Sequence, residues 1–255
     1  MRNGLLDKLA NKKEIFTVEE ALEESNLKKD SLLVLLSRLE KNGWIERIEK
    51  GKYMIVPLGS EKGKYTLDEF VLASSLVEPY CIGYWSALNY HGFTEQIPTT
   101  VFVQTTSRKK KRLKKIFGVK FKVVKLNEEK FFGREKFWSG NIQINVTDKE
   151  KTIVDCLDKP KYCGGIVEVA KGIESEDYDK DKIVQYIDKI GNTAVLRRFG
   201  YLCDLYGIDI DLPNLDTKNY LLLDPTHSKK GDNNSKWRLK INLNQRELKA
   251  ENDQG

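Results

Sequence analysis

The sequence predicts an α+β protein with two units, a small N-terminal one and a larger C-terminal one. Two observations lead to this expectation. Residues 26–57 combine an amphipathic helical pattern with a short β-hairpin pattern. From residue 66 onward, helical and strand patterns are mixed without a regular strand–helix–strand alternation, so a doubly wound parallel sheet is not expected.

The helix of the first pattern is expected from Asp30 to Asn42. Asp30 can cap its start, and Gly43 suits the left-handed conformation that follows many helix ends. A rotation of about 100° per residue places a row of leucines on the inward side, with Ser37, Arg38 and Lys41 opposite. The inward residues are Leu32, Leu35, Leu36 and Leu39.

A hairpin follows directly, with strands at 44–48 and 53–56 and a turn at 49–52. Upstream, residues 5–9 indicate a short first helix, and Thr17 with Glu20 forms the capping-box pattern of a second helix. Helices followed by a short hairpin are the layout of a winged helix-turn-helix. The recognition helix of a helix-turn-helix usually lies in a DNA major groove.

The remaining helices are predicted from capping boxes, apolar periodicity and the Gly and Pro residues that end them. Two of them start at the capping-box patterns Thr66–Glu69 and Thr147–Glu150, and Gly191 and Gly207 end the last two. They are expected at 66–76, 85–91, 147–159, 166–173, 180–190 and 193–206.

Strands are predicted where β-branched residues gather or where apolar and polar residues alternate. A polar loop, His227–Lys236, is expected to join the last two strands, and the last dozen residues are predicted to be frayed. The strands are expected at 99–105, 119–123, 142–146, 220–223 and 237–243.

The positive charge is not concentrated in the N-terminal unit. The chain holds 44 Lys and Arg against 38 Asp and Glu, a net charge of +6. Residues 1–57 hold 11 basic against 10 acidic residues, a net of +1, whereas residues 101–140 hold 13 against 3, a net of +10. The overall charge mildly favours an acidic partner, but the positive excess lies outside the predicted DNA-binding unit.

Composition excludes several classes of protein. No apolar run approaches the roughly 20 residues that span a bilayer. The charged N-terminus is unlike a secretory signal, so a cytoplasmic protein is expected. With only two histidines and no C-x-x-C pair, no metal or other cofactor is expected, and the thiols are predicted to be buried or incidental. The cysteines are Cys81, Cys156, Cys163 and Cys203.

Candidate DNA contacts lie before the recognition helix, on its outward side and on the hairpin. Their types suit phosphate oxygens, and Ser37 or Arg38 could reach a base edge. Asp30 and Val34 occupy outward positions where a DNA-reading helix more often carries polar or basic residues, so a module that binds only protein is the alternative. The candidates are Lys28, Lys29, Ser31, Ser37, Arg38, Lys41, Arg47, Lys50, Lys52 and Tyr53.

A second candidate surface is the run 108–115, in which seven of eight residues are basic. Such a density favours an anionic partner. One interpretation is a sequence-independent DNA contact that supplements a near-neutral winged helix. The others are a contact with an acidic protein partner and a solvated, charged helix start. The basic residues are Arg108, Lys109, Lys110, Lys111, Arg112, Lys114 and Lys115.

An enzyme is not expected. Asp209 and Asp211 form a D-x-D pattern as in nucleotidyltransferases, but no Gly-Ser turn precedes them at short range. Asp155, Glu168 and Lys171 could be combined into a metal-dependent nuclease site. They fall on predicted helices, however, and the two acids are expected to be exposed helix charges, so a nuclease is the weakest alternative.

His91 also has no nucleophile signature beside it. It precedes Gly92 at a predicted helix end, where a histidine interacts well with the helix dipole. Packing or capping is its expected role.

Residues 84–98 contain Ser86–Leu88, His91-Gly92 and Thr94 in the pattern S-A-L-x-x-H-G-hydrophobic-T. This segment resembles one of the AbiEi-type antitoxin family, the antitoxins of type IV toxin–antitoxin systems. Residues 146–170 resemble the family's helix pair, and the order of elements agrees over roughly residues 1–243.

The resemblance implies a transcriptional regulator that represses its own promoter at an inverted repeat in double-stranded DNA. It would bind there as a homodimer or as two cooperative monomers. The C-terminal domain would counter a nucleotidyltransferase-like toxin encoded alongside, whereas lone homologues would be plain regulators. The expected domains are a DNA-binding domain at 1–59, an AbiEi-like domain at 66–243 and a flexible tail at 244–255. An antitoxin that binds only protein is the alternative.

Overall fold

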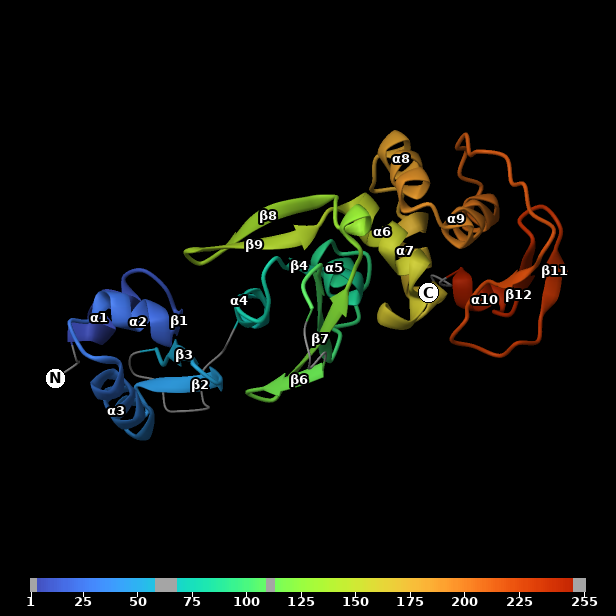
Figure 1. The fold of residues 1–255 in the computed structure, drawn as a ribbon. Coiled ribbons are helices and arrows are strands. Elements are labelled where there is room, and N and C mark those ends of the chain that lie inside the picture. Colours follow the sequence, from blue (N-terminus) through green and yellow to red (C-terminus); the bar gives the residue numbers. More distant parts are fainter. Residues whose placement is uncertain (1–3, 58–67, 109–112, 250–255) are drawn as a thin grey trace, which may run out of the picture.

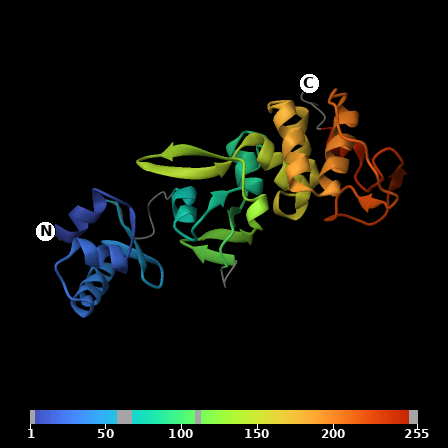
Figure 2. The same cartoon turned by 45° about the horizontal axis from the view of Figure 1, so that its top comes forward.

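The computed structural model describes residues 4–57, 68–108 and 113–249. It places the N-terminal unit at one end and a mostly helical region at the other, with a β-sheet between them (Figures 1 and 2). Helices and sheets are both present, so the predicted α+β class is confirmed.

The N-terminal unit packs three helices against a small antiparallel sheet. The helices are α1 (Gly4–Ala10), α2 (Val18–Glu24) and α3 (Lys29–Lys41). The sheet has the order β1-β3-β2, with β1 at Ile15–Thr17, β2 at Ile45–Glu49 and β3 at Lys52–Ile55. Its core contains the predicted inward residues Leu32, Leu36 and Leu39, with Leu35 partly buried beside them.

The helix ends of this unit agree with the sequence in two places and differ in one. The Thr17 hydroxyl accepts a hydrogen bond from the Glu20 amide (3.2 Å), and the Glu20 carboxylate accepts one from the Thr17 amide (2.8 Å), so the capping box is confirmed. Gly43 has the expected left-handed conformation. The predicted cap at Asp30 is wrong, because α3 starts one residue earlier and Lys28 occupies the cap position.

The central sheet has six strands in the order β6-β7-β5-β4-β9-β8. Two neighbouring pairs, β4–β9 and β5–β7, are parallel and the other pairs are antiparallel. The strands are β4 (Cys81–Ile82), β5 (Thr100–Thr105), β6 (Leu113–Ile116), β7 (Val119–Lys125), β8 (Arg134–Ser139) and β9 (Ile142–Thr147).

Two apolar clusters cover the two faces of this sheet. On one face, α4 (Glu69–Ser74) packs Val71 and Leu72 against β4, β5 and β9. On the other face, α5 (Tyr84–Tyr90) joins the core of the helical region. Asp68 caps α4 through the Phe70 amide (2.8 Å); of the capping box predicted there, Thr66 lies outside the described residues.

The helical region contains α6 (Lys149–Asp158), α7 (Ile166–Glu174), α8 (Lys180–Ile190) and α9 (Thr193–Tyr206). The last two have the predicted bounds, and left-handed Gly191 and Gly207 end them as expected. The predicted capping box of α6 is wrong. Asp148 caps the helix, and Glu150 instead accepts a hydrogen bond from the Asp179 amide (2.9 Å) and pairs with Lys182 (2.7 Å).

A small three-stranded sheet closes the chain. Its order is β10-β12-β11, with β10 at Leu221–Leu222, β11 at Asp232–Asn234 and β12 at Leu239–Ile241. β11 lies in the predicted loop His227–Lys236. Of the tail predicted to be frayed, Gln245–Leu248 form α10, which packs the buried Leu248 against the helical core, and residues 250–255 lie outside the described residues.

Candidate nucleic-acid interface

The outward side of α3 is the most accessible part of the predicted site. Its serine candidates, Ser31 and Ser37, are exposed, as are its basic ones. The basic candidates here are Lys28, Lys29, Arg38 and Lys41. No described residue forms a hydrogen bond or an ion pair with their side chains, so their charges are available to an anionic partner.

Apolar side chains share this surface. Leu33 is 42% exposed and Val34 is 54% exposed, and Leu27 before the helix is 41% exposed. An apolar side chain in a major groove can contact a thymine methyl group, and the same side chains suit a protein partner. The surface of α3 is therefore mixed in character.

The hairpin is less available than the sequence predicts. Tyr53 is only 3% exposed, stacks on Phe16 with 5.9 Å between ring centroids and belongs to the core. Arg47 donates hydrogen bonds to the Tyr53 hydroxyl and to Glu40, both at 3.1 Å. The structure thus places Tyr53 inside the unit rather than on its surface, because its ring fills the space beside β1.

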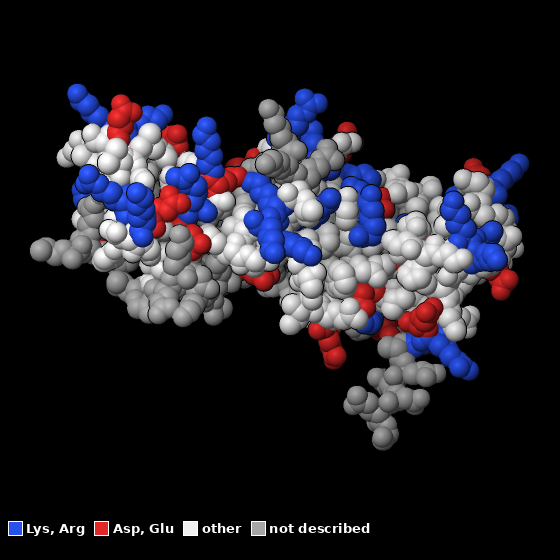
Figure 3. Space-filling view, turned by 90° about the horizontal axis from the view of Figure 1, so that it is seen from below, with Lys and Arg blue, Asp and Glu red and all other residues white. Residues whose placement is uncertain are grey.

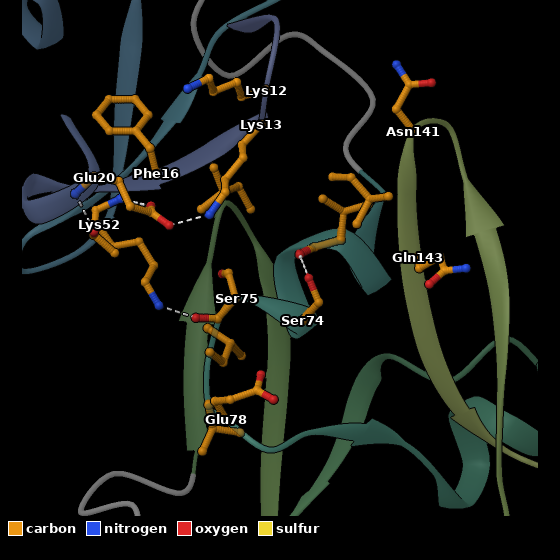
Figure 4. Close-up of a pocket in the computed structure, with 16 residues that line it drawn as sticks. Lys12, Lys13, Phe16, Glu20, Lys52, Ser74, Ser75, Glu78, Asn141 and Gln143 are labelled. Carbon is orange, nitrogen blue, oxygen red and sulfur yellow. Dashed lines mark hydrogen bonds and ion pairs between the residues drawn. The ribbon is translucent and has the colours of Figure 1, made fainter. Parts of the chain in front are cut away.

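The strands of the hairpin also contact the central sheet domain. Ile48 and Met54 belong to the same apolar cluster as Val71, and the strand register shifts between Arg47 and Glu49. Lys52 donates to the Ser75 carbonyl, which Figure 4 shows. Of the hairpin candidates, Lys50 is exposed, and no described residue pairs with it.

A cavity of ≈ 740 Å³ lies at this junction (Figure 4). Its lysines are already committed to neighbours. Lys12 pairs with Glu24, Lys13 pairs with Glu20, and Lys52 lies 3.6 Å from Glu49. The lysines of the cavity therefore offer little uncompensated positive charge, and Glu78 also lines it.

The predicted basic run lies at the start of an edge strand. Residues 109–112 lie outside the described residues, and β6 begins at Leu113, so the described part of the run continues as a strand rather than a helix start. Lys114 pairs with Glu49 of the N-terminal unit, whereas Arg108 and Lys115 are exposed. Lys115 lies opposite Lys120 on the neighbouring strand. Figure 3, seen from the side where α3 and β6 lie, shows basic side chains over both units.

The sequence predicts that the two carboxylates considered for nuclease chemistry are exposed. This prediction is wrong, because both are buried. Asp155 is 3% exposed, pairs with the buried Lys151 and accepts a hydrogen bond from the Gln104 amide group (2.6 Å). Glu168 pairs with Lys171 (2.9 Å) and accepts a hydrogen bond from Thr94. Each acid is thus held by its own partners.

The remaining reactive groups have structural surroundings. His91 is the C-cap of α5, and its Nε2 lies 2.7 Å from the Thr147 carbonyl oxygen, so the predicted packing or capping role is confirmed. The four cysteines are buried, as expected, and burial raises the pKa of the Cys156 thiol. Asp209 and Asp211 are exposed. Within the described ranges, no three His, Cys, Asp or Glu residues form a group able to hold a metal ion.

Sequence reasoning missed Lys151 and Gln104, which hold Asp155. The i,i+4 spacing of Lys151 and Asp155 was a visible signal, since such pairs face each other on a helix. Gln104 lies 51 positions away and gave no signal.

The three helices and the small sheet of the N-terminal unit have the layout of a helix-turn-helix domain. Residues 5–56 match the model of the family described as "Transcriptional regulator, AbiEi antitoxin", so the predicted resemblance is confirmed for this segment.

A solved structure extends the similarity to the whole fold. The RV2827C protein from Mycobacterium tuberculosis is 14% identical and has a TM-score of 0.66. The alignment covers 96% of this chain and 92% of that one. At this identity the match shows the fold alone. No curated protein matches the chain. In the described part of the chain, no helix combines the length and apolarity needed to cross a membrane.

Proposed function

We propose that the protein is a cytoplasmic, DNA-binding repressor that reads an inverted repeat in its own promoter with α3. The observation that supports this most is the set of exposed cations along α3, with which no described residue pairs. Lys28 and Lys29 stand at the helix start, where phosphate contacts fix the register of a protein on DNA. Arg38 lies about two and a half helical turns after Lys29, where it can reach a base edge.

The packing of the hairpin against the central sheet domain limits which of its residues can contact DNA. Lys52 and Tyr53 are engaged within the protein, so α3 and Lys50 carry the contact made by the N-terminal unit. Arg108 and Lys115 supply a second, sequence-independent contact from the sheet edge. Two chains, as a dimer or as cooperative monomers, occupy the two halves of the repeat.

We further propose that the C-terminal domain counters a nucleotidyltransferase-like toxin. The family match of the N-terminal domain supports this, since the family is described as an antitoxin. An adjacent nucleotidyltransferase gene would agree with the antitoxin role, and its absence would favour a plain regulator.

The decisive experiment is a gel shift of the protein's own upstream DNA across a range of salt concentrations, with magnesium added to expose any cleavage. Lys29→Gln, at a phosphate-contacting position, should weaken binding and reduce the salt slope by about 0.9 log units per log unit of salt. Arg38→Gln should weaken binding and relax the sequence preference at the base that Arg38 contacts. Lys218→Gln, on an exposed segment far along the chain, is the matched control and should change none of these quantities. No shift of the upstream DNA even at low salt would refute the regulator proposal.

A second candidate function is an antitoxin that binds only protein. The exposed Leu33 and Val34 favour it, because apolar residues at the centre of α3 suit a protein interface. The same gel shift separates the two functions, since this candidate predicts no shift.

A further inference from the structure

A cavity of ≈ 540 Å³ lies on the C-terminal domain, away from α3. Its walls come from three segments that are distant in the sequence. These are β7 at 122–125, the connection from α6 into the short 3₁₀ turn η2 (Pro160–Tyr162), and residues 225–226 after β10. Such a volume is within the range of small-molecule sites.

The charge around this cavity is strongly positive. Four lysines line it: Lys122, Lys125, Lys159 and Lys161. Among the described residues, none forms an ion pair or hydrogen bond with any of their ammonium groups; the Lys161 ammonium lies over the Tyr162 ring, 5.0 Å from its centroid. Several like charges around one concavity raise its potential and favour an anion there.

The one acid among the lining residues does not offset these charges. Asp158 pairs with Lys130 (3.3 Å) and accepts a hydrogen bond from Asn192 (2.6 Å), and its side chain is only 8% exposed. The Asp158 charge is therefore balanced by Lys130, which is not among the residues that line the cavity. The carbonyl end of α6, which would repel an anion, is also engaged, since Arg198 donates to the Leu157 carbonyl (2.6 Å).

Tyr162 gives the cavity an aromatic wall. Tyr162 packs edge-on against Tyr84, with 5.1 Å between ring centroids, and against Phe102 at 5.8 Å. Tyr84 is buried beneath it. An aromatic wall beside flexible ammonium groups suits a ligand with a planar ring and several anionic oxygens.

We propose that this cavity binds a small phosphorylated molecule, of the class of nucleoside di- or triphosphates. The lysines that line the cavity supply positive charge for a di- or triphosphate, and the Tyr162 ring offers a surface for the base. A concave site of this size fits a small molecule better than a straight duplex, whose phosphates are spaced along an extended surface. The proposal does not depend on DNA binding by α3.

Calorimetric titration of the full chain tests the site, with pyrophosphate and ATP as probes. Both should bind saturably at one site. The variant Lys122→Gln/Lys159→Gln/Lys161→Gln should weaken both at least tenfold. The control Lys8→Gln/Lys218→Gln/Lys249→Gln removes the same charge from exposed positions elsewhere and should bind as the original chain does. The single variant Lys161→Gln, at an exposed position, should show a smaller loss and replaces the triple variant if that one does not fold.

Three results would overturn the proposal. One is the absence of saturable binding by pyrophosphate and ATP. Another is an equal loss of affinity in the pocket variant and the control, which would indicate only general charge. The last is a pocket variant that loses affinity for a DNA duplex while neither chain binds the small anions, which would assign these lysines to DNA. Arg38→Gln separates this test from the DNA proposal, since it should leave pyrophosphate binding unchanged.

Discussion

Lys114 on β6 forms an ion pair with Glu49 at the end of β2, although the two residues are 65 positions apart in the sequence. The side chains of Lys114 and Glu49 are 13% and 27% exposed. The pair joins the N-terminal unit to the edge of the central sheet. Part of the basic run therefore holds the two units together.

Removing this ion pair should loosen the junction. Lys114→Gln is expected to lower the free energy of unfolding by about 1 kcal/mol, the upper range for partly exposed pairs. It should also speed proteolytic cleavage between the units. Lys115→Gln, at the exposed neighbouring position, is the matched control. Equal cleavage rates for the two variants would contradict a specific role for Lys114.

The buried pair of Lys151 and Asp155 should be far more sensitive to substitution. Lys151→Met is expected to cost about 3–5 kcal/mol of unfolding free energy, because it leaves the Asp155 charge buried, with Gln104 as its remaining partner in the described part of the chain. Lys151→Met combined with Asp155→Leu should recover much of this loss. Chemical denaturation of both single variants and the double variant measures it. An additive double variant would show that the charges do not interact.

Asp224 should make stability depend on pH in the acid range. Burial raises the pKa of Asp224, but hydrogen bonds from Thr226 and from the Ile166 amide outweigh this, so the pKa lies below its ordinary value of 3.8. A lowered folded-state pKa means that the stabilisation is present above pH 3.8 and is lost as the pH falls through the folded pKa.

Asp224→Asn tests this sign. The original chain should exceed the variant in thermal stability at neutral pH, and the difference should shrink as the pH falls below 3.8. His227, whose Nδ1 lies 3.2 Å from Asp224, adds attraction once protonated. The double variant with His227→Gln removes that contribution. A stability difference that is constant with pH would refute the role of the Asp224 charge.

Gly165 should tolerate no side chain. Its φ is +96°, and an added Cβ would lie 2.6 Å from the Asp224 carboxylate. Gly165→Ala should therefore cost clearly more unfolding free energy than Gly207→Ala. The latter has a φ of +71° and open space, and should lose only the roughly 1–2 kcal/mol of a left-handed alanine. Equal losses in thermal denaturation would show that the structure relaxes around the contact.

The sequence predicts best the elements whose signals are local. α8 and α9 have the predicted bounds because amphipathic periodicity and terminal glycines agree there. The sequence does not predict β8, because Arg134, Glu135 and Lys136 are all charged and show no alternation of apolar and polar residues. An edge strand whose residues are exposed forms without such alternation. β6 was missed because its pairing with β7, not its basic composition, makes it a strand.

The candidate site could be predicted only in part for the same reason. The exposed cations of α3 follow from the helical period. The burial of Tyr53 and of Asp155 depends on residues far away in the sequence, Phe16 and Gln104, that only the fold brings close. Residue type alone therefore assigned a core tyrosine to the surface and a buried acid to solvent.

The docked hairpin also limits how the protein can be divided experimentally. Ile48 and Met54 complete an apolar cluster whose other members belong to the second domain. A fragment ending near residue 57 would expose both side chains to water and would tend to self-associate. The whole chain should instead melt in one cooperative transition, so the N-terminal unit is best studied attached to the sheet that supports it.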